Sequence, residues 1–85
     1  MEYSGEELNA FAGKYTSDDL PLPIEVTRNG RELMAQAQGQ SSFTLGVVRR
    51  NVFGFDAAGL VMEFDPEKGT FILKQGGGEF LYKKN

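Results

Sequence analysis

The sequence predicts a small all-β protein: a closed or nearly closed antiparallel up-and-down barrel of about eight short strands after a short N-terminal helix. Three observations support this fold class. Apolar and polar residues alternate with a period of two over most of the chain. Turn residues recur at the spacing of about 8–12 residues that is typical of sandwiches and barrels. Most turns are of hairpin length, and a long meander with one apolar face closes on itself to remove its edges.

The chain begins with the signature of a short helix. Ser4 is a helix-capping residue, and Glu7 stands three positions later, where a capping box requires an acidic side chain. Leu8 and Phe11 are spaced to form one apolar stripe. Gly13 is expected to end the helix, which would plug one end of the barrel.

A proline-containing loop separates the first two predicted strands. Residues 14–17 form the first strand, and the second begins near Leu22, with Ile24 facing the core. Pro21 and Pro23 have no backbone N–H group to donate. The start of the second strand is therefore expected to be unpaired on one side.

The Asn29-Gly30 pair is the strongest short-range signal for a hairpin in this chain. It predicts a type I′ turn with both residues at positive φ, followed by a strand over residues 31–38. Further turns are expected at residues 39–41, 49–51, 56–59, 65–69 and 76–78, the fourth as a type I turn closed by a glycine bulge.

Apolar residues alternate with polar residues along the predicted strands, so each strand has one apolar face. The apolar positions include Leu33, Ala35, Ala37, Phe43, Leu45, Val47, Leu60, Met62, Phe64, Phe71, Leu73, Phe80 and Tyr82. An eight-stranded barrel is about wide enough to be filled by side chains or to hold one small ligand. We expect Phe43, Leu45, Phe64, Phe71 and Leu73 to fill it.

Composition limits the function. The 85 residues predict one domain over 1–85, and a net charge of −3 with mixed signs argues against a nucleic-acid or anionic-membrane surface. No apolar run approaches the roughly 20 residues of a membrane span. The chain has no cysteine or histidine, which removes thiol nucleophiles, the usual general base and zinc ligands. No catalytic, metal-binding or cofactor-binding residue is predicted, and the chain is not expected to be an enzyme.

Paired carboxylates are the remaining candidates for chemistry. Asp18 and Asp19 are adjacent in a loop, and Glu63 and Asp65 share one face of a strand. One interpretation is acid–base catalysis or a calcium site. The other, which we favour, is a solvated loop and a polar outer face, because carboxylates are mostly exposed. The three glycines at 76–78 are interpreted as a hairpin turn, since strand residues rather than a helix follow them.

Arg49, Arg50, Phe53 and Phe55 form the candidate contact surface for a protein partner. Arginine and aromatic side chains contribute most of the binding energy in many interfaces. The expectation requires that one of the two phenylalanines points outward. If both are buried, the segment is a charged turn followed by core aromatics.

A pattern of core and turn positions extends over nearly the whole chain. It comprises Leu8-x-x-Phe11-x-Gly13-x-Tyr15, Ile24-x-Val26, Asn29-Gly30, Leu33, Phe53 or Phe55, Val61-x-x-Phe64, and Gly69-x-Phe71-x-Leu73. In this pattern the chain resembles the lipocalin-like domain found at the C-terminus of bacterial serine hydrolases related to β-lactamases and penicillin-binding proteins.

The resemblance implies a non-catalytic accessory domain that binds a protein partner or is covalently linked to a hydrolase or peptidase domain. It also implies a periplasmic or secreted location. The sequence itself leaves three alternatives open: a cytoplasmic protein, a removed leader, or a segment of a longer chain. The alternative function is a lipocalin-like carrier of a small hydrophobic ligand, which would need an interior cavity of about 300 Å³ or more.

Overall fold

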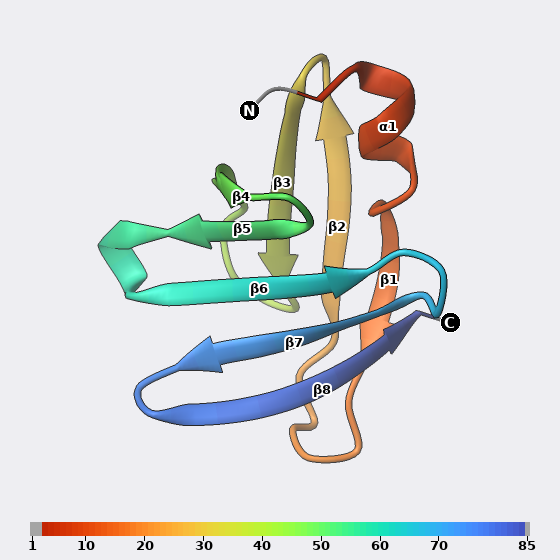
Figure 1. Ribbon diagram of the computed structural model, residues 1–85. Helices are drawn as coiled ribbons and strands as arrows, with labels where there is room; N and C mark the ends of the chain where they lie inside the picture. Colours follow the sequence, from red (N-terminus) through yellow and green to blue (C-terminus); the bar gives the residue numbers. More distant parts are fainter. Residues whose placement is uncertain (1–2, 85) are drawn as a thin grey trace.

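Eight antiparallel strands form a closed barrel in which each strand pairs with its neighbours in sequence and β1 pairs with β8 (Figure 1). This computed structural model describes residues 3–84. The elements are α1 (Gly5–Asn9), β1 (Gly13–Thr16), β2 (Ile24–Asn29), β3 (Glu32–Ala37), β4 (Phe43–Arg49), β5 (Val52–Phe55), the 3₁₀ turn η1 (Asp56–Ala58), β6 (Leu60–Asp65), β7 (Thr70–Gln75) and β8 (Gly78–Lys84). The predicted all-β meander with one short helix is confirmed.

Helix α1 begins as the sequence predicts. The Glu7 backbone N–H donates to Ser4 Oγ at 3.2 Å, and the Ser4 N–H donates to Glu7 Oε1 at 2.9 Å, which completes the capping box. These hydrogen bonds hold the pKa of the Glu7 carboxyl below its usual value. Leu8 and Phe11 are buried at this end of the barrel, and Gly13 starts β1 at a φ of +149° that favours glycine.

Strand β4 carries the chain round a corner of the barrel. Its first half pairs with β3 and its second half with β5, and a β-bulge lies between Val47 and Arg49. Bulges bend a strand and increase its twist. In Figure 1 β2 and β3 run up and down the view, whereas β5 to β8 run across it. The two groups of strands therefore cross, with the core between them.

Aromatic rings fill the axis of the barrel. Neighbouring rings form an unbroken series of contacts, with centroids between 4.7 and 6.1 Å apart. We call this series the aromatic chain; its members are Tyr3, Phe11, Tyr15, Phe53, Phe64, Phe71 and Tyr82. Phe64 is central, because it contacts rings on both sides of the chain. The predicted inward orientation of Leu33, Phe64 and Phe71 is confirmed by their burial.

Two strand predictions are corrected by the structure. Strand β2 begins at Ile24 rather than Leu22, so Pro21 and Pro23 precede the strand and create no unpaired strand edge. Val47, expected in the core, is 40% exposed. Val47 pairs with the buried Phe53 and so faces the core side of the sheet, but it is exposed because it lines an open hollow at the α1 end of the barrel.

The β2–β3 turn also differs from the prediction. Asn29 is the last residue of β2, so Gly30 and Arg31 form the loop. Gly30 has a φ of +64°, and neither Asn29 nor Arg31 has a positive φ. Positive φ at the first loop position alone is the pattern of a type II′ turn, so the predicted type I′ turn is wrong. Positive φ at both loop positions occurs instead at Gly76 and Gly77, with values of 60° and 82°.

Phe64→Ala tests the aromatic chain. Removing the central ring leaves a cavity, and we expect the free energy of unfolding to fall by about 3–5 kcal/mol. Thr27→Ala, on the exposed face of β2, is the control and should change it by less than about 0.5 kcal/mol. Urea denaturation measures both. A loss below about 1 kcal/mol for Phe64→Ala would contradict the central position of this ring.

Gly30→Ala tests the turn. A Cβ atom at Gly30 would have no other heavy atom within 4 Å, so the cost comes from the positive φ alone. We expect a loss of about 1 kcal/mol in the free energy of unfolding, measured in urea. The control Arg31→Ala changes the other loop residue, which has no positive φ, and should have little effect. Equal losses in the two variants would show that Gly30 is not required for its φ.

Candidate interaction surface

The structure separates the four residues predicted as a contact surface. Phe53 is 1% exposed and belongs to the aromatic chain, so it is excluded as a contact residue. Phe55 lies two residues further along β5, faces the same side, and stacks on Phe43 at 4.6 Å. Of the two rings, Phe55 alone is partly exposed, at the end of the barrel rather than on its outer face. Arg49 lies 3.5 Å from Glu63, and Arg50 is exposed in the β4–β5 turn.

The carboxylates singled out in the sequence have structural contacts or lie in solvent. Glu63 accepts a hydrogen bond from Lys74 Nζ at 3.0 Å, in addition to its ion pair with Arg49. Asp65 Oδ1 accepts from the Lys68 N–H at 3.3 Å in the β6–β7 turn. Asp18 and Asp19 are exposed in the loop before β2. Within residues 3–84 no group of acidic side chains is arranged to hold a metal ion.

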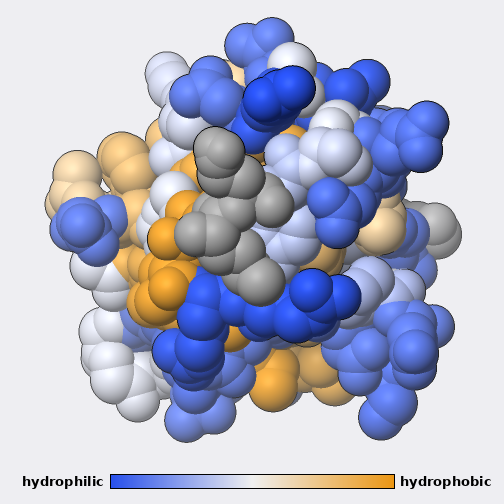
Figure 2. All heavy atoms as spheres, turned by 45° about the horizontal axis from the view of Figure 1, so that its top comes forward, coloured by the Kyte–Doolittle hydropathy of each residue, from blue (hydrophilic) through white to orange (hydrophobic). Residues whose placement is uncertain are grey.

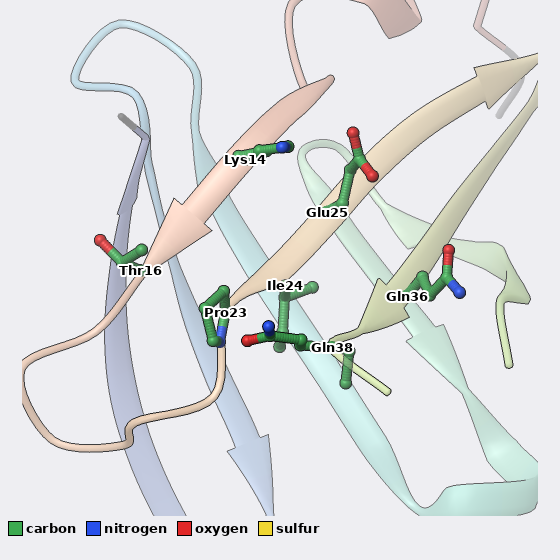
Figure 3. A pocket seen from close by; sticks show the side chains of 8 residues that line it. Lys14, Thr16, Pro23, Ile24, Glu25, Gln36 and Gln38 are labelled. Carbon is green, nitrogen blue, oxygen red and sulfur yellow. The ribbon is translucent and has the colours of Figure 1, made fainter. Parts of the chain in front are cut away.

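A groove of about 340 Å³ crosses the outer face of β1, β2 and β3. Lys14 and Glu25 are cross-strand partners, as are Glu25 and Gln36, and Figure 3 shows the three side chains in a row across these strands. Ile24 and Ala37 reach the groove only where the strands end. The groove combines polar side chains with the apolar side chains of Pro23, Ile24 and Ala37, and it is open to solvent rather than enclosed in the barrel interior.

A second, smaller hollow at the α1 end of the barrel also reaches inward-facing residues. Its volume is about 160 Å³, and Tyr3, Leu8, Leu33 and Phe53 contribute to its wall. Pockets for small molecules usually have about 300–1,000 Å³. Beyond this hollow the aromatic chain occupies the barrel axis, so the described interior offers little room for a carried ligand.

The opposite end of the barrel is formed by the loops 17–23, 38–42 and 56–59 and by the Gly76-Gly77 turn, which lie away from α1 in Figure 1. Strands β4 and β8 start at this end, and β5 finishes there. Five apolar residues at this end are only half buried and pack against the core. We call them the apolar rim: Leu20, Leu22, Phe43, Phe55 and Phe80.

Exposure confirms that the two ends of the barrel differ. At the α1 end Leu8 and Phe11 are 1% and 2% exposed. At the rim end Ile24 and Ala37, the last inward-facing residues of their strands, are 7% and 9% exposed. The apolar rim lies beyond them and is more exposed still. The helix therefore covers one end of the core, whereas the other end presents apolar side chains to solvent.

Two buried tyrosines connect segments outside the strands to the barrel through hydrogen bonds to backbone carbonyls. Tyr82 Oη donates to the Leu22 carbonyl at 2.9 Å, which ties the 17–23 loop to β8. Tyr15 Oη donates to the Phe11 carbonyl at 2.8 Å. Burial raises the pKa of Tyr82 and raises the pKa of Tyr15 to about 12. Both phenols stay protonated at neutral pH and act as structural donors.

Other exposed apolar residues are scattered over the outer face. Val47 and Val48 are exposed at the bulge of β4, and Leu81 is exposed on β8. Figure 2, in which the α1 end is turned toward the viewer, shows a largely hydrophilic surface with apolar residues gathered at its left. Single exposed apolar residues are common on soluble proteins. The rim differs because its five members converge on one end of the core.

Comparison of the chain with protein-family models, with curated proteins and with solved structures finds no match. No helix within residues 3–84 is long and apolar enough to cross a membrane. The functional conclusion therefore depends on the packed interior and the surface of this barrel.

Burial of Tyr15 predicts a loss of stability at alkaline pH. Its pKa is about 12 in the folded protein against an ordinary value of 10.0, so the unfolded chain releases the proton first. This contribution is fully present below about pH 10 and is lost as the pH rises through about 12. Urea denaturation between these pH values measures it, with Tyr15→Phe as the control. The variant should lose less stability over this range than the wild type, and an unchanged loss would contradict the assignment.

Proposed function

We propose that this protein is a non-catalytic accessory domain that binds another protein through its apolar rim. One observation supports the proposal: aromatic rings fill the barrel, while five apolar side chains at one end are only partly buried. A cluster of apolar side chains at the surface marks an interaction site more often than scattered residues do. The filled interior favours this role over the lipocalin-like carrier.

The contacts of the titratable groups support a non-catalytic role. Active sites typically contain groups whose pKa values are shifted by their arrangement in a cleft. The pKa values of Glu7, Tyr15 and Tyr82 are shifted, and each of these side chains caps a helix or donates to a backbone carbonyl. Glu63 is paired with two cations. These contacts stabilise the fold and leave none of the four groups free for acid–base chemistry.

The sequence resemblance supplies the first partner to test. It favours a bacterial serine hydrolase or peptidase, either as a domain of the same chain or as a separate protein. Docking such a domain against the apolar rim would remove the five half-buried side chains from water. Burial of apolar surface is worth about 25 cal/mol per Å², which favours association at this end of the barrel.

Photo-crosslinking at two adjacent positions tests the proposed function. A benzophenone amino acid replaces Phe80, in the rim, or Leu81, which is the matched control because it is 43% exposed on the outer face of the same strand. After irradiation in an extract of the source cells, we expect a specific protein product from position 80 and not from position 81. An active-site-directed fluorophosphonate then shows whether the product is a serine hydrolase.

The carrier function makes the opposite prediction. It expects lipid or another small apolar molecule, rather than protein, to be attached at position 80. That result, or protein products from position 81 alone, would overturn the proposed function.

A further inference from the structure

We propose that the segment which docks on the apolar rim carries basic side chains on both sides of its apolar residues. This inference rests on the proposed function and adds the chemistry of the partner. The loops that surround the rim contain Asp18, Asp19 and Asp56, and they contain no lysine or arginine. An apolar surface bordered by carboxylates is complementary to a cationic, amphipathic segment.

The three carboxylates are next to the rim in sequence and in space. Asp18 and Asp19 share the 17–23 loop with Leu20, and Asp56 directly follows Phe55. A hollow of about 250 Å³ lies beside the first two, and another of about 330 Å³ is lined by Phe55 and Asp56. Long basic side chains can lie along apolar surface in such hollows while their charged heads reach the carboxylates.

These negative charges are not neutralised within the described part of the chain. Asp18, Asp19 and Asp56 are exposed, and no ion pair joins any of them to a cation of residues 3–84. Lys83 lines the hollow beside Asp18 but forms no ion pair with it. The ion pairs of Arg49 and Lys74 are both made with Glu63. The rim therefore lies in a negative potential that attracts a cationic partner.

Charges of both signs occur at the other end of the barrel. Arg31, Arg50 and Lys68 lie in the three hairpin turns at the α1 end, and Glu6, Glu32 and Glu67 are exposed at the same end. The loops around the rim contain carboxylates and no basic residue, which directs a cationic segment to the rim.

The same charges disfavour the other occupants of an apolar surface. A second copy of this chain would bring two acidic rims together. A fatty acid or an anionic membrane would place carboxylate or phosphate groups beside the three aspartates. Each arrangement opposes like charges at short distance, which is unfavourable. Charge complementarity therefore selects the basic, apolar peptide segment.

Titration of the labelled protein with short peptides, followed by amide chemical shifts, tests the inference. The probe is an acetylated and amidated peptide with lysine at both ends and leucine, phenylalanine and leucine between serines. One comparison peptide has glutamate in place of lysine, and another has serine in place of the apolar residues. We expect saturable shifts at Leu20, Phe55 and Phe80 with the first peptide and much weaker binding of the other two.

Two matched charge variants isolate the carboxylates. The rim variant Asp18→Asn/Asp19→Asn/Asp56→Asn should bind the lysine peptide about tenfold more weakly, since each exposed ion pair contributes modestly. The control Glu6→Gln/Glu32→Gln/Glu67→Gln makes the same change of charge with exposed residues of the α1 end, and its affinity should stay within about twofold of the wild type. Phe80→Ser should also weaken binding, whereas Leu81→Ser should not.

The inference is overturned if the glutamate peptide binds as tightly as the lysine peptide, or if the shifts lie away from the rim. Binding of phosphatidylglycerol vesicles or dimerisation through the rim, seen by sedimentation, would also overturn it. If position 80 crosslinks a protein while the lysine peptide does not bind, the proposed function stands and this inference fails. If the peptide binds at the rim but position 80 crosslinks no protein, the chemistry of the surface stands and the proposed function fails.

Discussion

The aromatic chain along the barrel axis is the constraint on which the rest of this structure depends. Small barrels have a narrow interior, and rings are an efficient way to fill it. The rings come from both ends of the sequence, from Tyr3 to Tyr82. Tyr3 stacks on Phe53, and its Oη accepts a hydrogen bond from the Asn51 N–H at 2.7 Å. The segment before α1 and the last four strands therefore share one core, which supports a closed barrel in a chain without disulfides.

Because aromatic rings fill the barrel axis, a ligand or partner has to contact the outside of the barrel. A barrel with an empty centre would place its ligand inside, between the sheets. In this barrel the centre is solid, one end is covered by α1, and what remains is the outer face and the apolar rim. The outer groove on β1 to β3 is open to solvent and has a mixed polar and apolar lining. We propose the rim as the binding surface because five apolar side chains that pack against the core lie at that end.

Local sequence rules predicted what depends on local structure. Alternation placed Leu33, Phe64 and Phe71 in the core, and the Ser4–Glu7 pair formed the expected capping box. The incorrect predictions concern features that depend on how strands pair with each other. Asn29 pairs with Glu32 and is therefore the last residue of β2, so the turn lies one residue later than predicted. Alternation placed Val47 on the correct face, beside Phe53, but it could not show that this end of the barrel leaves Val47 exposed in a hollow.

The candidate site was harder to predict for the same reason. Arg50 and Phe55 are close in sequence, but β5 places them at opposite ends of the barrel, and the shared parity of Phe53 and Phe55 turns both rings inward. The rim is assembled from a loop, β4, β5 and β8, so no continuous motif contains it. The available signal was the pair Leu20 and Leu22, two apolar residues in a proline-rich loop that has no regular structure.

Electrostatics links the apolar rim to the kind of partner that we propose for it. At physiological ionic strength a charge acts over about 8 Å, so only carboxylates beside the rim affect what approaches it. Asp18 and Asp19 precede Leu20, and Asp56 follows Phe55, whereas Arg31 and Arg50 are at the far end of the barrel. In the proposed interaction, the same carboxylates repel the acidic rim of a second copy and attract a basic partner segment. The net charge of −3 does not show this local arrangement, because it is the fold that brings the loops with Asp18, Asp19 and Asp56 to one end of the barrel.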